Sequence, residues 1–97
     1  MANFCDNTLQ VCSSNSENIT YIKKFFEDWT HYIDEFDSEN IQVCFDSKWD
    51  FPENDMEELY QGLPDKEDIN MVCLSVEWGN FYCCFHVCTK DGWEVIQ

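Results

Sequence analysis

A strand followed by a helix is encoded in residues 8–33, TLQVCSSNSENITYIKKFFEDWTHYI. Thr8 to Cys12 alternates apolar with other side chains, which is typical of a half-buried strand. Five apolar residues then recur at the spacing of one helix face: Ile19, Ile22, Phe26, Trp29 and Ile33. Asn15 or Ser16 is expected to cap this helix. His31 falls near its end, where a histidine interacts favourably with the helix C-terminus.

The middle of the chain predicts a second strand and a short second helix. Residues 34–40 form an acidic break, and residues 41–45 alternate again as a strand. Residues 46–54 are expected to be an ordered loop. A helix should follow through Met56, Leu59 and Tyr60. Asn54 or Asp55 is its expected cap, and Gly62 its end.

The last third predicts three strands joined by hairpins. Residues 69–78 and 81–89 are rich in strand-forming side chains, and Gly79-Asn80 between them is typical of a two-residue turn. Asp91-Gly92 is a second such signal before a short strand at residues 93–96. The order strand, helix, strand, helix and three strands predicts one α+β domain over residues 1–97. Its mainly antiparallel sheet should carry both helices on one face.

The net charge is the most unusual property of the chain. Twenty acidic residues face five lysines and no arginine, so the formal charge is -15 over 97 residues. An aromatic content of 16% still supplies a core, which argues against disorder. Such a field attracts basic proteins and repels nucleic acids and anionic membranes. The simpler interpretation is that the acidity serves only solubility.

Most of the acidic residues are concentrated between Glu27 and Asp68, and aromatic residues are interleaved with them. Aromatic side chains are favoured anchors of protein interfaces, and rows of carboxylates imitate the phosphates of a nucleic acid. The candidate partner-binding residues are Glu27, Asp28, Asp34, Glu35, Asp37, Glu39, Trp49, Asp50, Glu53, Asp55, Glu57 and Glu58.

Seven cysteines cannot form a closed set of disulfides within one chain. Residues 1–6 have neither the basic region nor the apolar run of a secretory signal, and no stretch reaches the length of a membrane span. A reducing cytoplasm is therefore the expected compartment.

A metal site at residues 83–88 is an alternative interpretation. Cys84, His86 and Cys88 share one face of a strand, but one straight strand hardly lets three ligands reach one zinc ion. Core cysteines with a half-buried His86 on the other face are the preferred interpretation. A loose calcium loop at Asp34, Asp37 and Glu39 lacks the EF-hand glycine. No catalytic arrangement is recognisable, so neither an enzyme nor a cofactor is expected.

Three segments carry a family resemblance. They are MANFCDNTLQV at residues 1–11, SKWDFP at 47–52 and EWGNF at 77–81. In this order they resemble the Api-like proteins of phages and mobile elements, which have a ferredoxin-like domain. Phe4 stands where the family usually has tryptophan. The resemblance spans most of the chain and implies a ferredoxin-like sandwich and a phage-type origin. It implies no activity.

Charge and resemblance together predict an acidic phage-type inhibitor in the host cytoplasm. It would occupy the basic channel of a nucleic-acid-binding defence nuclease, of the CRISPR or restriction type, as a nucleic-acid mimic. It would not itself bind nucleic acid or membrane. The alternatives are an immunity protein or antitoxin that neutralises a basic toxin, a non-inhibitory phage structural protein, and a metal-dependent or thiol enzyme built on Cys84, His86 and Cys88.

Overall fold

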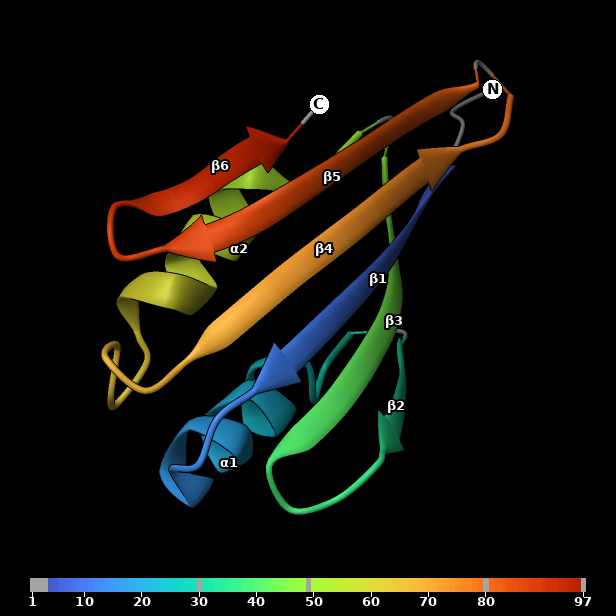
Figure 1. Ribbon diagram of the computed structural model, residues 1–97. Helices are drawn as coiled ribbons and strands as arrows, with labels where there is room; N and C mark the ends of the chain where they lie inside the picture. The colour runs from blue at the N-terminus through green and yellow to red at the C-terminus, as the bar shows by residue number, and fades with distance from the viewer. Residues whose placement is uncertain (1–3, 30, 49, 80, 97) are drawn as a thin grey trace.

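The computed structural model describes residues 4–29, 31–48, 50–79 and 81–96. These residues form six strands and two helices (Figure 1). In chain order they are β1 (Phe4–Cys12), α1 (Ser16–Phe25), β2 (His31–Glu35), β3 (Asn40–Lys48), α2 (Glu53–Gln61), β4 (Asn70–Glu77), β5 (Tyr82–Thr89) and β6 (Gly92–Ile96).

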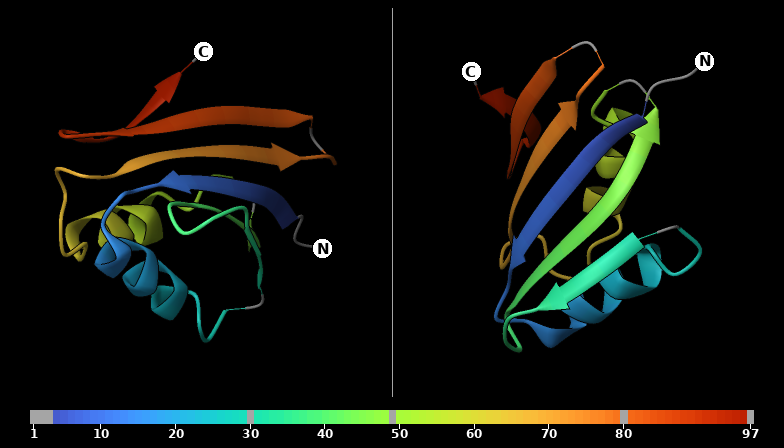
Figure 2. Two further views of the ribbon diagram at one scale, coloured as in Figure 1. Left: turned by 60° about the horizontal axis from the view of Figure 1, so that its bottom comes forward. Right: turned by 90° about the vertical axis from the view of Figure 1, so that its right-hand side faces the viewer.

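The described strands make one antiparallel sheet in the order β2-β3-β1-β4-β5-β6. α1 connects β1 to β2 across β3, and α2 connects β3 to β4 across β1. Both connections pass over the same face, so the two helices cover one side of the sheet (Figure 2). The first four strands and two helices thus form the expected ferredoxin-like α+β sandwich. β5 and β6, each joined to the preceding strand by a hairpin, extend the sheet beyond β4.

The sequence-based prediction of the first helix is wrong at its C-terminal end. α1 ends at Phe25, and the Phe26 N–H closes its last turn on the carbonyl of Ile22. His31 and Ile33 belong to β2 instead, so His31 is not at a helix end. The helical spacing continues because Trp29, from the turn, and Ile33, from the strand, pack against the same core. Asn15 is the N-cap, as predicted, and accepts a hydrogen bond from the Glu17 N–H.

Two boundaries in the middle of the chain also differ from prediction. β3 continues through Lys48, because residues 46–48 pair with β1, so this stretch is not loop. Neither Asn54 nor Asp55 caps α2. The helix begins at Glu53 after Pro52, without a side-chain cap, and both predicted caps lie inside it. Gly62 ends α2 as predicted.

The two C-terminal hairpins differ from each other. The last pair between β4 and β5 is Glu77 with Tyr82, so their connection is longer than the predicted two-residue turn at Gly79-Asn80, of which Asn80 lies outside the described residues. Phe81 has a left-handed φ of 56°. The second hairpin has a two-residue turn, and Gly92 follows it with a φ of 104° that favours glycine.

The core lies between the sheet and the helices. Its side chains come from every helix and from β1, β3 and β4, and they include Leu9, Ile22, Val43, Leu59 and Met71. Near the C-terminal end of α1, the core side chains are aromatic instead of aliphatic. The Phe26 ring lies 4.9 Å from that of Phe45 and 5.0 Å from that of Trp29, measured between centroids. This cluster joins the end of α1 to β3.

A buried amide ties α1 to the α2–β4 connection. Asn18 Nδ2 donates to the carbonyl oxygens of Asp65, at 2.8 Å, and Asp68, at 3.0 Å. Asn18 Oδ1 accepts from the Asp65 N–H at 3.0 Å. The same Nδ2 also donates to Ser13 Oγ. One fully buried side chain therefore joins α1 and the loop before it to the α2–β4 connection, which is 47–50 positions away in sequence.

Candidate protein-interaction surface

The sheet face opposite the helices is not covered by any described element (Figure 2). We call it the open face. Strand register divides it into two halves with different chemistry. The acidic half lies on β1, β2 and β3, and its outward residues are Asp6, Thr8, Gln10, Tyr32, Asp34, Gln42, Cys44 and Asp46. The apolar half lies on β4, β5 and β6, and its residues are Val72, Leu74, Val76, Cys83, Phe85, Val87 and Ile96.

Two carboxylates oppose each other in the acidic half. Asp6 of β1 and Asp46 of β3 are direct cross-strand partners. Burial raises the pKa of Asp46, and the hydrogen bond and the negative charge of Asp6 raise it further. Trp78 Nε1 donates to Asp6 Oδ2 at 3.2 Å and neutralises none of this charge. The pair therefore forms a concentrated negative site on the open face.

Asp46→Asn is expected to stabilise the folded chain at pH 7 by about 0.5 kcal/mol, because opposed like charges on neighbouring strands destabilise a sheet. The pKa of Asp46 is raised in the fold, so the penalty of the native carboxylate exists above that pKa and disappears as the pH falls. The gain should therefore vanish near pH 3, which urea unfolding at the two pH values measures. Asp28→Asn, at an exposed turn position, is the control. A gain that persists at low pH would contradict this electrostatic origin.

A shallow hollow of about 440 Å³ lies beside the carboxylate pair, and Asp6, Thr8, Tyr32, Cys44 and Asp46 are among its lining residues. The Tyr32 side chain is exposed, and a hydrogen bond to Asp34 raises the pKa of its hydroxyl. The hollow therefore combines carboxylates with an accessible aromatic ring, which suits contact with cationic side chains.

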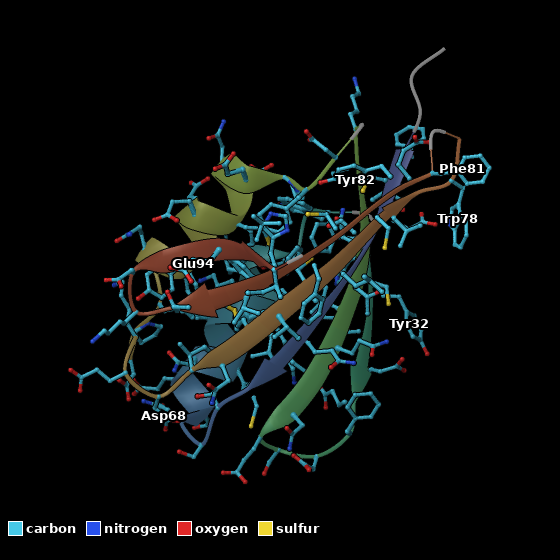
Figure 3. The ribbon with its side chains drawn as sticks, turned by 45° about the horizontal axis from the view of Figure 1, so that its top comes forward. Tyr32, Asp68, Trp78, Phe81, Tyr82 and Glu94 are labelled. Carbon is cyan, nitrogen blue, oxygen red and sulfur yellow. The ribbon has the colours of Figure 1, made fainter. Side chains whose placement is uncertain are left out.

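Aromatic side chains also stand at the end of the open face. Trp78 and Phe81 lie together at the tip of the β4–β5 hairpin (Figure 3). They are 69% and 88% exposed, respectively, which is unusual for side chains of this size. Phe4, at the start of β1, is exposed as well. Trp78 and Phe81 extend the apolar surface beyond β4 and β5, and Phe4 adds an aromatic ring at the end of β1.

The predicted acidic residues fall into two separated groups. Glu27, Asp28, Asp34, Glu35, Asp37 and Glu39 lie on β2 and the loops beside it, at one edge of the sheet. Asp50, Glu53, Asp55, Glu57 and Glu58 lie on α2 or just before it. α2 packs under β6, the opposite edge of the sheet, where the Glu57 carboxylate approaches Gly92. Trp49 lies outside the described residues. Of the predicted residues that the structure describes, only Asp34 belongs to the open face.

Several acidic residues of the β2 group already have partners. Glu35 forms an ion pair with Lys23. Asp37 Oδ1 accepts from the Glu39 N–H and from Asn40 Nδ2, and these hydrogen bonds lower the pKa of Asp37. Asp37 therefore stabilises the β2–β3 turn and remains ionised at neutral pH. Because Asp34 lies in β2, away from that turn, the loose calcium loop does not form as a unit.

Cys84, His86 and Cys88 do share one face, as predicted for the metal alternative. That face is the helix-covered one, since they pair with Ser75, Cys73 and Met71. His86 is therefore not opposite the cysteines. Its ring stacks on Phe51, with centroids 3.7 Å apart, and burial lowers its pKa. Burial raises the pKa of Cys88 to about 12. Within the described ranges, no three His, Cys, Asp or Glu side chains are grouped to hold a metal ion.

Sequence reasoning missed most of the open face. Asp6 and Asp46 are forty positions apart, and only the β1–β3 register brings them together. The apolar half did leave a signal, because residues 71–76 are apolar or small at both odd and even positions. A strand with one solvated face alternates apolar and polar side chains. Continuous apolarity therefore indicated that both faces of β4 are chemically suited to burial.

No family model, curated protein or solved structure matches the chain. The likeness to Api-like phage proteins therefore stays a prediction from the three segments that carry it. Among the described residues, no helix is both long and apolar enough to cross a membrane.

Proposed function

We propose that this chain is an acidic binding protein that inhibits a basic, nucleic-acid-binding host protein by occupying its nucleic-acid channel. The observation that carries the proposal is the density of carboxylates. A B-DNA duplex 39 Å long carries about 23 phosphate charges. The described fold is 39 Å in its longest dimension, and the chain has 20 acidic residues.

The distribution of these residues supports a partner that surrounds the domain. One acidic group follows the β2 edge, the other follows α2 near the β6 edge, and the Asp6–Asp46 pair lies on the open face between the edges. A channel lined with lysine and arginine would meet carboxylates on more than one side. Each carboxylate would take the place of one phosphate in contact with a lysine or arginine of the channel. The chain would act by competition and not by catalysis.

The likeness to phage proteins directs the proposal to one class of partner. A phage benefits from blocking nucleases that cut its genome, so the proposed target is a CRISPR effector or restriction nuclease in the host cytoplasm. Repulsion between this chain and nucleic acid makes direct binding to DNA or RNA unfavourable. The partner is therefore the nuclease and not its substrate.

The test is competition between this chain and a labelled DNA duplex for purified nucleases of these two types. We expect the chain to displace the duplex and its apparent affinity to fall at least tenfold between 50 and 200 mM salt, because the contacts are ionic. The double variant Glu57→Gln/Glu58→Gln should weaken displacement at least fivefold. Glu17→Gln/Glu67→Gln removes the same charge outside the predicted binding residues and should have a smaller effect.

Two results would overturn the proposal. One is binding that is insensitive to salt. The other is binding that leaves the labelled duplex in place, since a mimic must exclude the nucleic acid from its channel. An equal loss for the two double variants would assign the effect to net charge and would contradict a defined contact through α2.

A further inference from the structure

The apolar half of the open face is continuous across three strands. Leu74 of β4, Phe85 of β5 and Ile96 of β6 are direct neighbours in one cross-strand row. Val72 and Val87 form the next row on one side, and Val76 and Cys83 the next on the other. Leu74, Phe85 and Ile96 are 40%, 37% and 50% exposed. Such a contiguous apolar surface on a folded chain indicates a binding site.

This surface is not required by the fold. The helices and the core lie on the other face, where Met71 and Cys73 are buried. An antiparallel sheet with one solvated face normally presents polar side chains outward. β1 and β3 follow that rule with Gln10 and Gln42, whose amides are hydrogen-bonded. The departure is therefore concentrated on β4, β5 and β6, and exposed Phe4 at the start of β1 is an exception outside them.

The charges around the apolar half define the chemistry of its occupant. Asp6 and Asp46 lie on one side, beyond Val76, and Glu94 lies on the other, beside Val87. The one lysine among the described outward positions of the strands is Lys48, two residues after Asp46 at the end of β3, so the carboxylates still outnumber it. A second copy would place its own carboxylates against these and would carry the same net charge of -15. A cationic occupant is favoured and a second copy is not.

The width of the surface selects the shape of the occupant. Three strands spaced about 4.8 Å apart place the outer two about 10 Å from each other. An α-helix with its side chains is about 10–12 Å across. A helix laid on this half would cover Leu74, Phe85 and Ile96 with an apolar stripe. Its flanks would then reach Asp6 on one side and Glu94 on the other.

We propose that the apolar half binds a basic amphipathic α-helix of the partner, with aliphatic side chains on one face and lysine or arginine along its flanks. The proposal rests on the proposed function for the basic character of that partner. It adds that ionic contact alone does not define the complex. Burial of Leu74, Phe85 and Ile96 supplies the part of the affinity that salt does not remove.

The test uses two synthetic helical peptides with the same number of lysines, one with leucine and one with alanine on the apolar face. Alanine keeps the helix but removes most of the apolar area. Calorimetry at 150 mM salt should show at least tenfold tighter binding of the leucine peptide to the native chain. Leu74→Ser/Phe85→Ser should lose at least fivefold of that affinity and leave the weak alanine peptide unchanged.

The edge strand supplies a matched pair of single variants that does not disturb the centre of the sheet. Ile96 and Val95 are neighbours with 50% and 48% exposure, and they point to opposite faces of β6. Ile96→Ser should weaken the leucine peptide, whereas Val95→Ser should not. Circular dichroism of both variants verifies that they fold.

Equal affinities for the two peptides, or equal effects of Ile96→Ser and Val95→Ser, would overturn the inference. So would a dimer in light scattering that Ile96→Ser dissociates, because the occupant would then be a second copy. Failure of the proposed function is distinguishable: the duplex would not be displaced from any nuclease, although the leucine peptide still binds the apolar half. Displacement that Ile96→Ser leaves unchanged would overturn only the present inference.

Discussion

Phe26→Ala is expected to lower the free energy of unfolding by about 4 kcal/mol. The Phe26 side chain is completely buried, and its ring contacts those of Phe25, Trp29 and Phe45. These rings come from α1, the turn after it and β3. Alanine leaves a cavity that rigid neighbouring rings cannot fill, so the loss includes a cavity cost as well as the lost burial. A domain of this size has a total stability of only about 5–15 kcal/mol.

Urea unfolding followed by tryptophan fluorescence measures this loss. Phe36→Ala is the control, because Phe36 is 64% exposed and should change stability by less than about 0.5 kcal/mol. Phe26→Leu keeps the site apolar and should lose less than the alanine variant. If Phe26→Ala and Phe36→Ala were equally stable, the aromatic cluster would not be the centre of the fold at this end.

Asn18→Ala is expected to cost about 3 kcal/mol, the second-largest effect. Its amide group bonds to backbone atoms of Asp65 and Asp68 and to Ser13 Oγ. Alanine leaves those backbone groups without their partner in a part-buried site, and each lost hydrogen bond of this kind costs about 1–3 kcal/mol. Alanine's better helix propensity offsets only a few tenths of this cost.

Thermal unfolding compares Asn18→Ala with Thr20→Ala, an exposed position in the same helix that should be close to neutral. Hydrogen exchange adds a local readout. The Asp65 N–H donates directly to Asn18, so its protection should fall more than that of the β1 amides. Unchanged protection at Asp65 would show that Asn18 does not hold the α2–β4 connection.

The sequence was sufficient for those elements whose pattern is local. The alternation of β1 and β3 and the caps at Asn15 and Gly62 all describe neighbouring residues. β2 could not be recognised in this way. Trp29 and Ile33 keep a helical spacing although one lies in a turn and the other in a strand, because both face the same core. Packing against one core thus produced, outside a helix, the residue spacing that usually indicates a helix.

The candidate surface was predictable only in part. Composition and clustering showed that the acidity is concentrated, and Asp34 was among the predicted residues. Strand register, however, cannot be deduced from composition. The row Leu74–Phe85–Ile96 and the pair Asp6–Asp46 exist only because particular strands are neighbours with a particular offset. The turn lengths that set those offsets were the least accurate part of the prediction.

The position of β1 has a consequence for how the protein is made. Of the six described strands β1 is translated before the other five, yet Leu9 pairs with Val43 on one side and Cys73 on the other. The sheet therefore cannot close around it until most of the chain has been translated. Contacts so distant in sequence form slowly, and an unfinished chain exposes apolar strands that invite aggregation. The large negative charge keeps nascent chains apart during that interval.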